Sequence, residues 1–164
     1  MDENFRRLYG QLLAEEISTS QFLRELKSVP DYSDYLLAAM DEQRRLRNLP
    51  AISKLIWGVA DAPSRKFTPL MCDLLDHHRY DGYMEAIADL LFDIGDERAV
   101  PSLIRALSYH VEGDSSHQFN RKLIYALNRI GTPAAIEGIR SAAQSPHALI
   151  REAANEVLRG KRIR

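Results

Sequence analysis

Apolar residues recur at intervals of three and four positions along almost the whole chain. Ile87, Leu90 and Leu91 form one such stripe, and Leu123 and Leu127 form another. This spacing places the apolar side chains on one face of an α-helix. No run of five or more residues shows the strict alternation that is expected of a half-buried strand. The pattern therefore predicts an all-α protein.

Start and stop signals divide this pattern into short helices. Ser18 precedes an apolar stretch as a cap, and Gly95 and Gly131 each follow the apolar end of a helix. We predict two N-terminal helices, near 2–17 and 19–28, followed by four helical pairs. The first helices of the pairs are expected near 33–47, 65–77, 98–109 and 134–144. The second helices are expected near 50–60, 82–94, 117–130 and 147–159.

The chain also repeats itself. At an offset of 36 residues, segment 83–107 aligns without a gap with segment 119–143, and Gly95 meets Gly131. Weaker copies follow at offsets of 32 and 30 residues. A period of this length, made of two helices, indicates an α-solenoid in which each unit packs only on its neighbours.

Two phrases carry a resemblance to a known family: LLFDIGDERAVPSLIRAL and SPHALIREAANEVL. They resemble HEAT repeats of the short, phycobilisome-lyase-like type, and the resemblance extends over about residues 64–160. It implies an all-α, right-handed α-α solenoid of about four HEAT-like helical pairs, forming one domain over residues 1–164. Residues 1–30 would be the N-terminal cap helices and 31–160 the repeats. It further implies that second helices line the concave inner face and first helices the convex outer face.

Polar residues recur at four-residue spacing on the expected second helices, so each set should form a stripe along its helix. The stripes occupy equivalent positions of successive repeats and change from acidic to basic along the chain. We predict a partner-binding concave face made of Glu85, Asp89, Asp93, Arg121, Tyr125, Arg129, Arg151 and Asn155. A solvated helix face, with some charges paired between adjacent repeats, is the alternative.

All five histidines fall at or beside turns between the two helices of a pair. Imidazoles beside aspartates have the chemistry of a metal or acid/base site. However, the adjacent His77 and His78 point in different directions on a helix, and the other histidines lie on loops of different lengths. We therefore predict no metal site. We predict instead a polar turn edge that contributes to partner binding, made of Asp76, His77, His78, Asp81, His110, Asp114 and His117.

Motifs of known catalytic sites are absent. The chain has no G-x-S-x-G, no P-loop, no Cys-x-x-Cys and no H-E-x-x-H. The HEAT-type proteins include a di-iron hydroxylase whose ligands are His-Glu dipeptides in successive repeats, and this chain contains no such dipeptide. We therefore expect no catalytic residue, no cofactor and no enzymatic activity.

One aromatic residue needs a separate interpretation. Trp57 lies on an expected helix beside Leu55, Ile56 and Val59. We predict that its ring packs in the core, which is the usual fate of an aromatic residue in such a run.

Composition and charge exclude some classes of protein. The net charge is −1, but residues 61–116 carry −6 and residues 117–164 carry +6, so the molecule should be strongly dipolar. The single cysteine, Cys72, allows no disulfide within the chain, which indicates a reducing compartment. No stretch approaches 18 apolar residues, and the N-terminal segment lacks the apolar region of a signal peptide. We predict a cytoplasmic protein that has no membrane attachment.

These observations favour a non-enzymatic protein-binding module of bacterial type. The most specific version is an immunity protein or inhibitor that neutralises a toxin partner by direct binding, because the acidic middle of the chain suits a basic toxin or nuclease domain. No small-molecule substrate is evident. One alternative is a bilin lyase-like or phycobiliprotein-maturation subunit. Another is a DNA-binding HEAT-like protein, although an acidic inner face makes nucleic acid an unfavourable partner.

Overall fold

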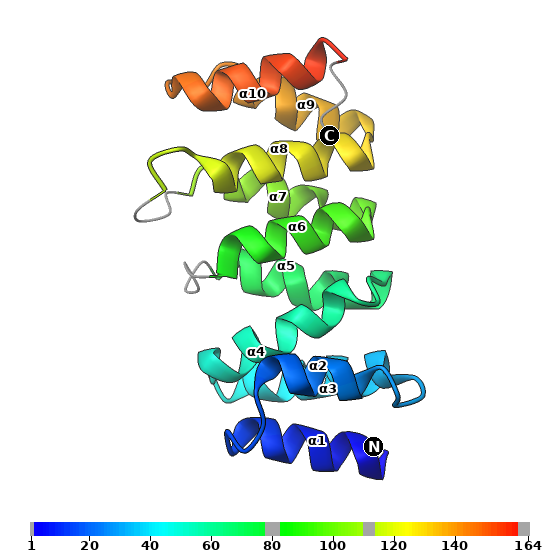
Figure 1. Ribbon diagram of the computed structural model, residues 1–164. Coiled ribbons are helices and arrows are strands. Elements are labelled where there is room, and N and C mark those ends of the chain that lie inside the picture. The colour runs from blue at the N-terminus through cyan, green and yellow to red at the C-terminus, as the bar shows by residue number, and fades with distance from the viewer. Residues whose placement is uncertain (1, 78–82, 110–113, 161–164) are drawn as a thin grey trace. The chain divides into compact units, whose positions relative to one another are not determined.

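The computed structural model describes residues 2–77, 83–109 and 114–160 (Figure 1). All regular structure in these three ranges is helical, which confirms the predicted all-α class. The chain falls into two compact units, Met1–Ser64 and Arg65–Arg164. A single domain over residues 1–164 stays a prediction.

The first unit contains four helices, which correspond to the two expected N-terminal helices and the first expected pair. They are α1 (Glu3–Leu13), α2 (Thr19–Leu26), α3 (Tyr32–Arg45) and α4 (Leu49–Ala60). The Asp2 carboxylate accepts hydrogen bonds from the first-turn N–H groups of α1, and the Ser18 hydroxyl does the same for α2. Helix α1 ends four residues before its predicted end, and Glu15 lies just beyond it in the left-handed region, with φ 59°.

Large apolar side chains from all four helices form the core of the first unit. The ones with almost no exposed surface are Phe5, Leu8, Leu12, Phe22, Leu26, Leu36, Met40, Ile52, Leu55 and Ile56. One polar network is buried with them, because Gln43 donates a hydrogen bond to the Tyr9 hydroxyl, which lies 3.2 Å from a Glu42 carboxylate oxygen. Burial raises the pKa of Tyr9 to about 12. The hydroxyl therefore stays protonated and donates a hydrogen bond to the Glu42 carboxylate.

Trp57 is not a core residue, so its predicted position is wrong. Its side chain is 52% exposed, although it lies within an apolar run of α4. The helix buries Leu55, Ile56 and Val59 on the side that faces the rest of the unit. Trp57 lies on the other side of the helix, and α4 is so uniformly apolar that the sequence pattern does not show which side is buried.

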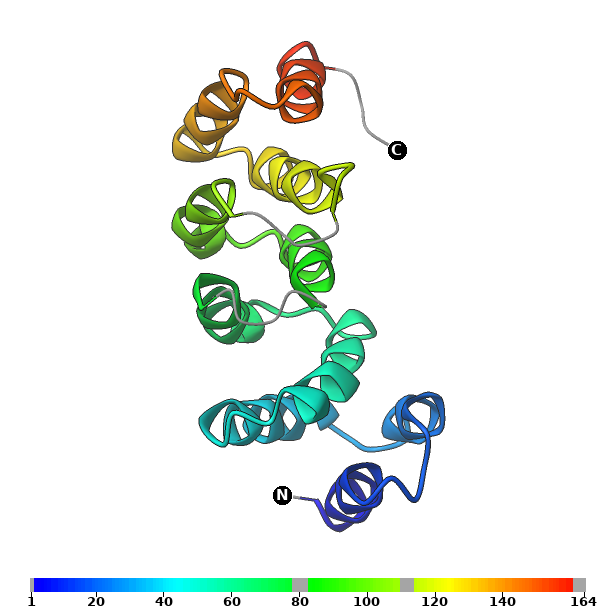
Figure 2. The same cartoon turned by 90° about the vertical axis from the view of Figure 1, so that its left-hand side faces the viewer.

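Three helical pairs form the second unit. The first helices are α5 (Thr68–Asp76), α7 (Val100–Ala106) and α9 (Pro133–Ala142), and the second helices are α6 (Met84–Ile94), α8 (Gln118–Ile130) and α10 (Ala148–Leu158). Short 3₁₀ turns, Arg65–Phe67 and Glu97–Ala99, precede α5 and α7. In Figure 2 the first helices of this unit stack in one row and the second helices in a parallel row. The three pairs lie where the internal repeat predicts them.

Glycine ends two of the second helices, as the sequence predicts. Gly95 and Gly131 adopt the left-handed conformation, with φ 61° and 69°. Their N–H groups donate to the carbonyl oxygens of Leu91 and Leu127, which closes the last turns of α6 and α8. Each turn then leads directly into the next first helix.

The buried carboxylate of Asp96 fixes the turn between α6 and α7. It accepts hydrogen bonds from the hydroxyl of Thr68 at 2.8 Å and from the backbone N–H of Arg98 at 3.1 Å. The Arg98 guanidinium also pairs with it at 2.6 Å and donates to the Arg65 carbonyl oxygen. Asp96 therefore links this turn to the start of α5 in the preceding pair. Arg98 in particular holds its pKa at about 2.

Replacing Asp96 by asparagine should lower the free energy of unfolding by about 2 kcal/mol at neutral pH, because the charged hydrogen bonds to Arg98 are lost. The stabilisation depends on the ionised form, so it is present above the ordinary aspartate pKa and is lost as the pH falls from about 4 to about 2. Urea unfolding across this pH range measures both effects. The neighbouring Glu97→Gln, at an exposed carboxylate, is the matched control. Equal stability of Asp96→Asn and wild type at neutral pH would contradict the assigned role.

Gly58 allows close packing within the first unit. A Cβ at this position would lie 2.9 Å from Leu36 and 3.2 Å from Leu26, and both leucines are buried and cannot move aside. Gly58→Ala should therefore destabilise the protein by about 1–2 kcal/mol in thermal or urea unfolding. At Gly10, where a Cβ would meet nothing within 4 Å, alanine should stabilise by up to about 1 kcal/mol. If both variants are stabilised, the close packing at Gly58 is not a constraint.

Candidate functional site

The predicted concave-face residues all lie on the second helices of the second unit. We call the outward side of α6, α8 and α10 the second-helix face. It also carries exposed apolar side chains that the sequence analysis did not select. Phe92 and Leu158 are each 39% exposed, and they occupy equivalent positions in their repeats. The face is therefore a mixture of charged and apolar groups.

A lysine neutralises much of the acidic end of this face. The Lys122 ammonium lies 3.0 Å from a Glu85 carboxylate oxygen and 2.7 Å from one of Asp89, so it bridges α8 to α6. Burial lowers the pKa of Lys122, but its hydrogen bonds to the two carboxylates outweigh that effect and leave the pKa raised. Two of the three predicted acidic residues thus form a contact between neighbouring repeats.

Several of the predicted basic and polar residues are held by local contacts. Arg121 donates to the Tyr125 hydroxyl at 3.4 Å on α8. The Arg151 guanidinium donates to the carbonyl oxygens of Ser145 and Pro146, both at 2.8 Å. The Asn155 side chain donates to the Arg151 carbonyl oxygen. Arg151 therefore braces the turn that precedes α10.

Two of the predicted charges stay available. Among the residues that the structure describes, Asp93 and Arg129 are exposed and form no ion pair. The Arg129 side chain lies against the C-terminal end of α6, since its Cγ is 4.0 Å from the place where a Cβ on Gly95 would be. Asp93 and Arg129 thus remain exposed charges without an ion pair among the described residues, and Phe92 is an exposed apolar side chain next to Asp93 in sequence.

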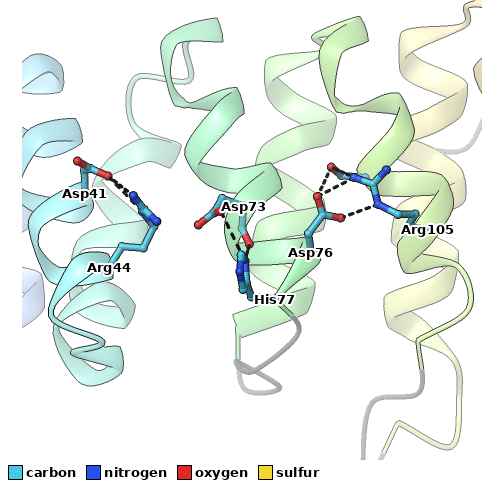
Figure 3. Close-up of polar contacts among 7 residues, drawn as sticks. Asp41, Arg44, Asp73, Asp76, His77 and Arg105 are labelled. Atoms are coloured by element: carbon cyan, nitrogen blue, oxygen red, sulfur yellow. Dashed lines mark hydrogen bonds and ion pairs between the residues drawn. The ribbon is translucent and has the colours of Figure 1, made fainter.

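The predicted turn edge divides into residues with different roles. The Asp76 carboxylate accepts hydrogen bonds from Ser102 at 2.8 Å and from Arg105 at 2.7 and 3.1 Å, and so joins α5 to α7 (Figure 3). Burial raises the pKa of Asp76, but its bonds to Arg105 and Ser102 have the greater effect, and the pKa is lowered. This contact gives Asp76 a role in joining two repeats, and its part in partner binding stays a prediction.

His77 and Asp114 also have local roles. The Nδ1 of His77 lies 2.7 Å from the Asp73 carbonyl oxygen at the C-terminal end of α5 (Figure 3). The Asp114 carboxylate accepts from the backbone N–H groups of Gln118 and Phe119 and so caps α8. The remaining predicted residues of the edge, His78, Asp81 and His110, lie outside the described residues.

The last member of the predicted edge, His117, lies against another histidine. Its ring centroid is 4.6 Å from that of His147, in the next repeat, and the ring planes are inclined by 47°. The two rings border a cavity of about 250 Å³. Its other lining residues are Leu107, Ser108, Tyr109, Asn120, Ser145, Pro146 and Ile150. Within the described ranges, no group of three or more histidine, cysteine or carboxylate side chains is placed to hold a metal ion.

The sequence analysis missed Lys122, Arg105 and His147 as members of these contacts. Each meets a partner in another repeat, 29 to 37 residues away. The spacing of residues within one helix does not predict a contact with a residue of another repeat. The internal alignment could have supplied one, because it places residues of successive second helices side by side.

The stacked helical pairs define a class, the α-solenoids built from HEAT-like repeats. The family described as PBS lyase HEAT-like repeat matches residues 85–109, so the chain carries a repeat of the predicted type. Comparison with curated proteins gives no match.

Among solved structures, human deoxyhypusine hydroxylase in complex with glycerol has a similar fold, with a TM-score of 0.58 and 21% sequence identity. The similarity covers 77% of this chain and 42% of that one, so this chain spans less than half the length of that protein. At this identity the likeness shows the fold alone.

The prediction that the chain is not an enzyme is corrected by this comparison. It rested on the absence of familiar catalytic motifs and on the use of solenoids as binding scaffolds. However, the solved structure that shares the fold is an enzyme, a deoxyhypusine hydroxylase. The fold therefore gives no reason to place this chain outside the enzymes.

In the described part of the chain, no helix combines the length and the apolar character that crossing a membrane requires.

Lys122 provides a test of how the acidic end of the face is held. Lys122→Met keeps the apolar stem but removes the charge between Glu85 and Asp89, and it should lower the free energy of unfolding by about 1 kcal/mol. Because the two carboxylates then repel each other, the deficit should shrink as sodium chloride is added. Lys122→Arg is the control that keeps the charge. If urea unfolding shows Lys122→Met to be as stable as wild type at low salt, the bridge does not stabilise the unit.

Proposed function

We propose that this chain binds a protein partner through the second-helix face. The observation that carries the proposal is the exposure of apolar and charged side chains at equivalent positions of the second helices. The apolar ones lie on α6 and α10, and the charged ones on α6 and α8 and at the end of α10. Phe92 and Leu158 provide apolar contact area, and Asp93 and Arg129 provide charges that form no ion pair with any residue the structure describes. Interfaces typically combine buried aromatic or aliphatic contacts with a charged rim.

The charges of the face indicate what kind of partner surface fits. Lys122 offsets one of the two negative charges of Glu85 and Asp89, and Asp93 is the acidic residue of the α6 stripe that forms no ion pair with a described residue. Exposed arginines follow on the later helices, Arg129 on α8 and Arg159 at the end of α10. A complementary partner would place a basic group at α6 and acidic groups along α8 and α10.

The most specific form of this proposal is an inhibitor or immunity protein for a toxin partner. Direct, stoichiometric blocking by a small solenoid needs only an exposed face of this kind. The bridge from Lys122 reduces the negative charge that a basic toxin or nuclease domain would meet, so the match would depend on shape and on Asp93 more than on net charge. A cytoplasmic location belongs to the same proposal.

The bilin-lyase and DNA-binding alternatives gain less support. The repeat family that matches residues 85–109 carries the lyase in its description, but no described residue of this chain can be assigned to a bilin. Binding to duplex DNA needs a continuous basic surface for the phosphates, and Glu85, Asp89 and Asp93 interrupt it on α6.

Reversing the two unpaired charges tests the face. Affinity capture from lysate of the source cells, followed by titration of the purified captured protein, should show that Asp93→Lys and Arg129→Glu each weaken the complex by about tenfold. Glu137→Lys, at an exposed carboxylate on the first helix α9, is the matched control and should bind as wild type does. If all three variants bind equally, the second-helix face is not the binding surface. For the inhibitor form, the captured protein should lose its toxic activity when it is mixed with this chain at a ratio of one to one.

A further inference from the structure

The cavity beside His117 and His147 has no part in the binding proposed above, and it contains chemistry of its own. Two imidazoles from the turns of successive repeats are brought together, 4.6 Å apart between ring centroids. Neither side chain makes a hydrogen bond to any of the described residues, so the ring nitrogens are open to another partner. We propose that this pair binds a divalent transition-metal ion of the zinc, nickel or copper class.

The separation of the rings fits two ligands of one ion. An imidazole nitrogen lies about 2.0–2.1 Å from zinc, so the centroids of two rings on one ion lie about 4.5–5.2 Å apart for ligand angles between square and tetrahedral. The observed 4.6 Å lies in that interval. Neutral imidazole is the usual protein ligand for zinc, copper and nickel.

The cavity supplies room for the remaining ligands. At about 250 Å³ it can hold several waters around an ion. The hydroxyl-bearing residues Ser108, Tyr109 and Ser145 are among those that line it. Two protein ligands are fewer than the three or four of most zinc sites, so the affinity should be moderate.

Some of the charges around the two rings oppose a bound cation, and one favours it. His117 and His147 are the N-cap residues of α8 and α10, at the positive ends of the two helix dipoles. The same dipoles and the Arg151 guanidinium, which is held by the Ser145 and Pro146 carbonyls, oppose a bound cation. The Asp114 carboxylate, which interacts with the His117 charge, offsets them.

The test is a titration of the full chain, free of any histidine tag, with zinc chloride and with nickel chloride. Isothermal calorimetry should show metal binding by wild type that weakens by about tenfold or more in His117→Asn and in His147→Gln. Asparagine is chosen at position 117 because it tolerates the left-handed φ of 51° there. His77→Gln, at a turn outside the cavity, is the matched control and should bind as wild type does.

A second readout guards against a folding artefact. Bound metal should raise the melting temperature of wild type and His77→Gln, and it should raise it much less in His117→Asn and His147→Gln. Circular dichroism without metal verifies that these variants are folded. Absence of zinc and nickel binding by wild type at millimolar concentrations would overturn the proposal. Unchanged affinity in both His117→Asn and His147→Gln would overturn it equally.

Discussion

The hydrogen bonds of one buried carboxylate connect the first two helical pairs of the second unit. Asp96 lies in the turn after α6, yet it binds the hydroxyl of Thr68 at the start of α5. It therefore holds both ends of one pair while it positions the first turn before α7. An ionised side chain at this depth is tolerated only because Arg98 and two further donors satisfy it.

Some polar groups of the second unit join neighbouring repeats, and others remain exposed for contact with a partner. Asp76 with Arg105, and Lys122 with Glu85 and Asp89, join neighbouring repeats and are largely satisfied by doing so. Once these pairs are removed from consideration, the exposed groups on the second helices are few. The candidate binding surface is consequently smaller and less acidic than the sequence of charges along the chain implies.

The sequence predicted the helices well because its signals for them are local. Apolar spacing, cap residues and the glycines that end α6 and α8 act within a few positions, and the expected pairs lie where the structure has them. The roles of individual polar residues were less predictable. Whether Asp76 faces a partner or Arg105 depends on a residue 29 positions away, and the pairing of His117 with His147 depends on how two turns stack. The prediction that Trp57 is buried failed for a related reason. An evenly apolar helix does not show from its sequence which of its sides is buried.

The links between repeats in the second unit are all short in sequence, and this bears on how the unit folds. Thr68 and Asp96 are 28 residues apart, Ser102 and Asp76 are 26 apart, and Lys122 and Asp89 are 33 apart. No chain loop longer than about one repeat has to close before such a contact forms, so the entropic cost of each step is small. Folding can therefore begin at any repeat and spread to its neighbours.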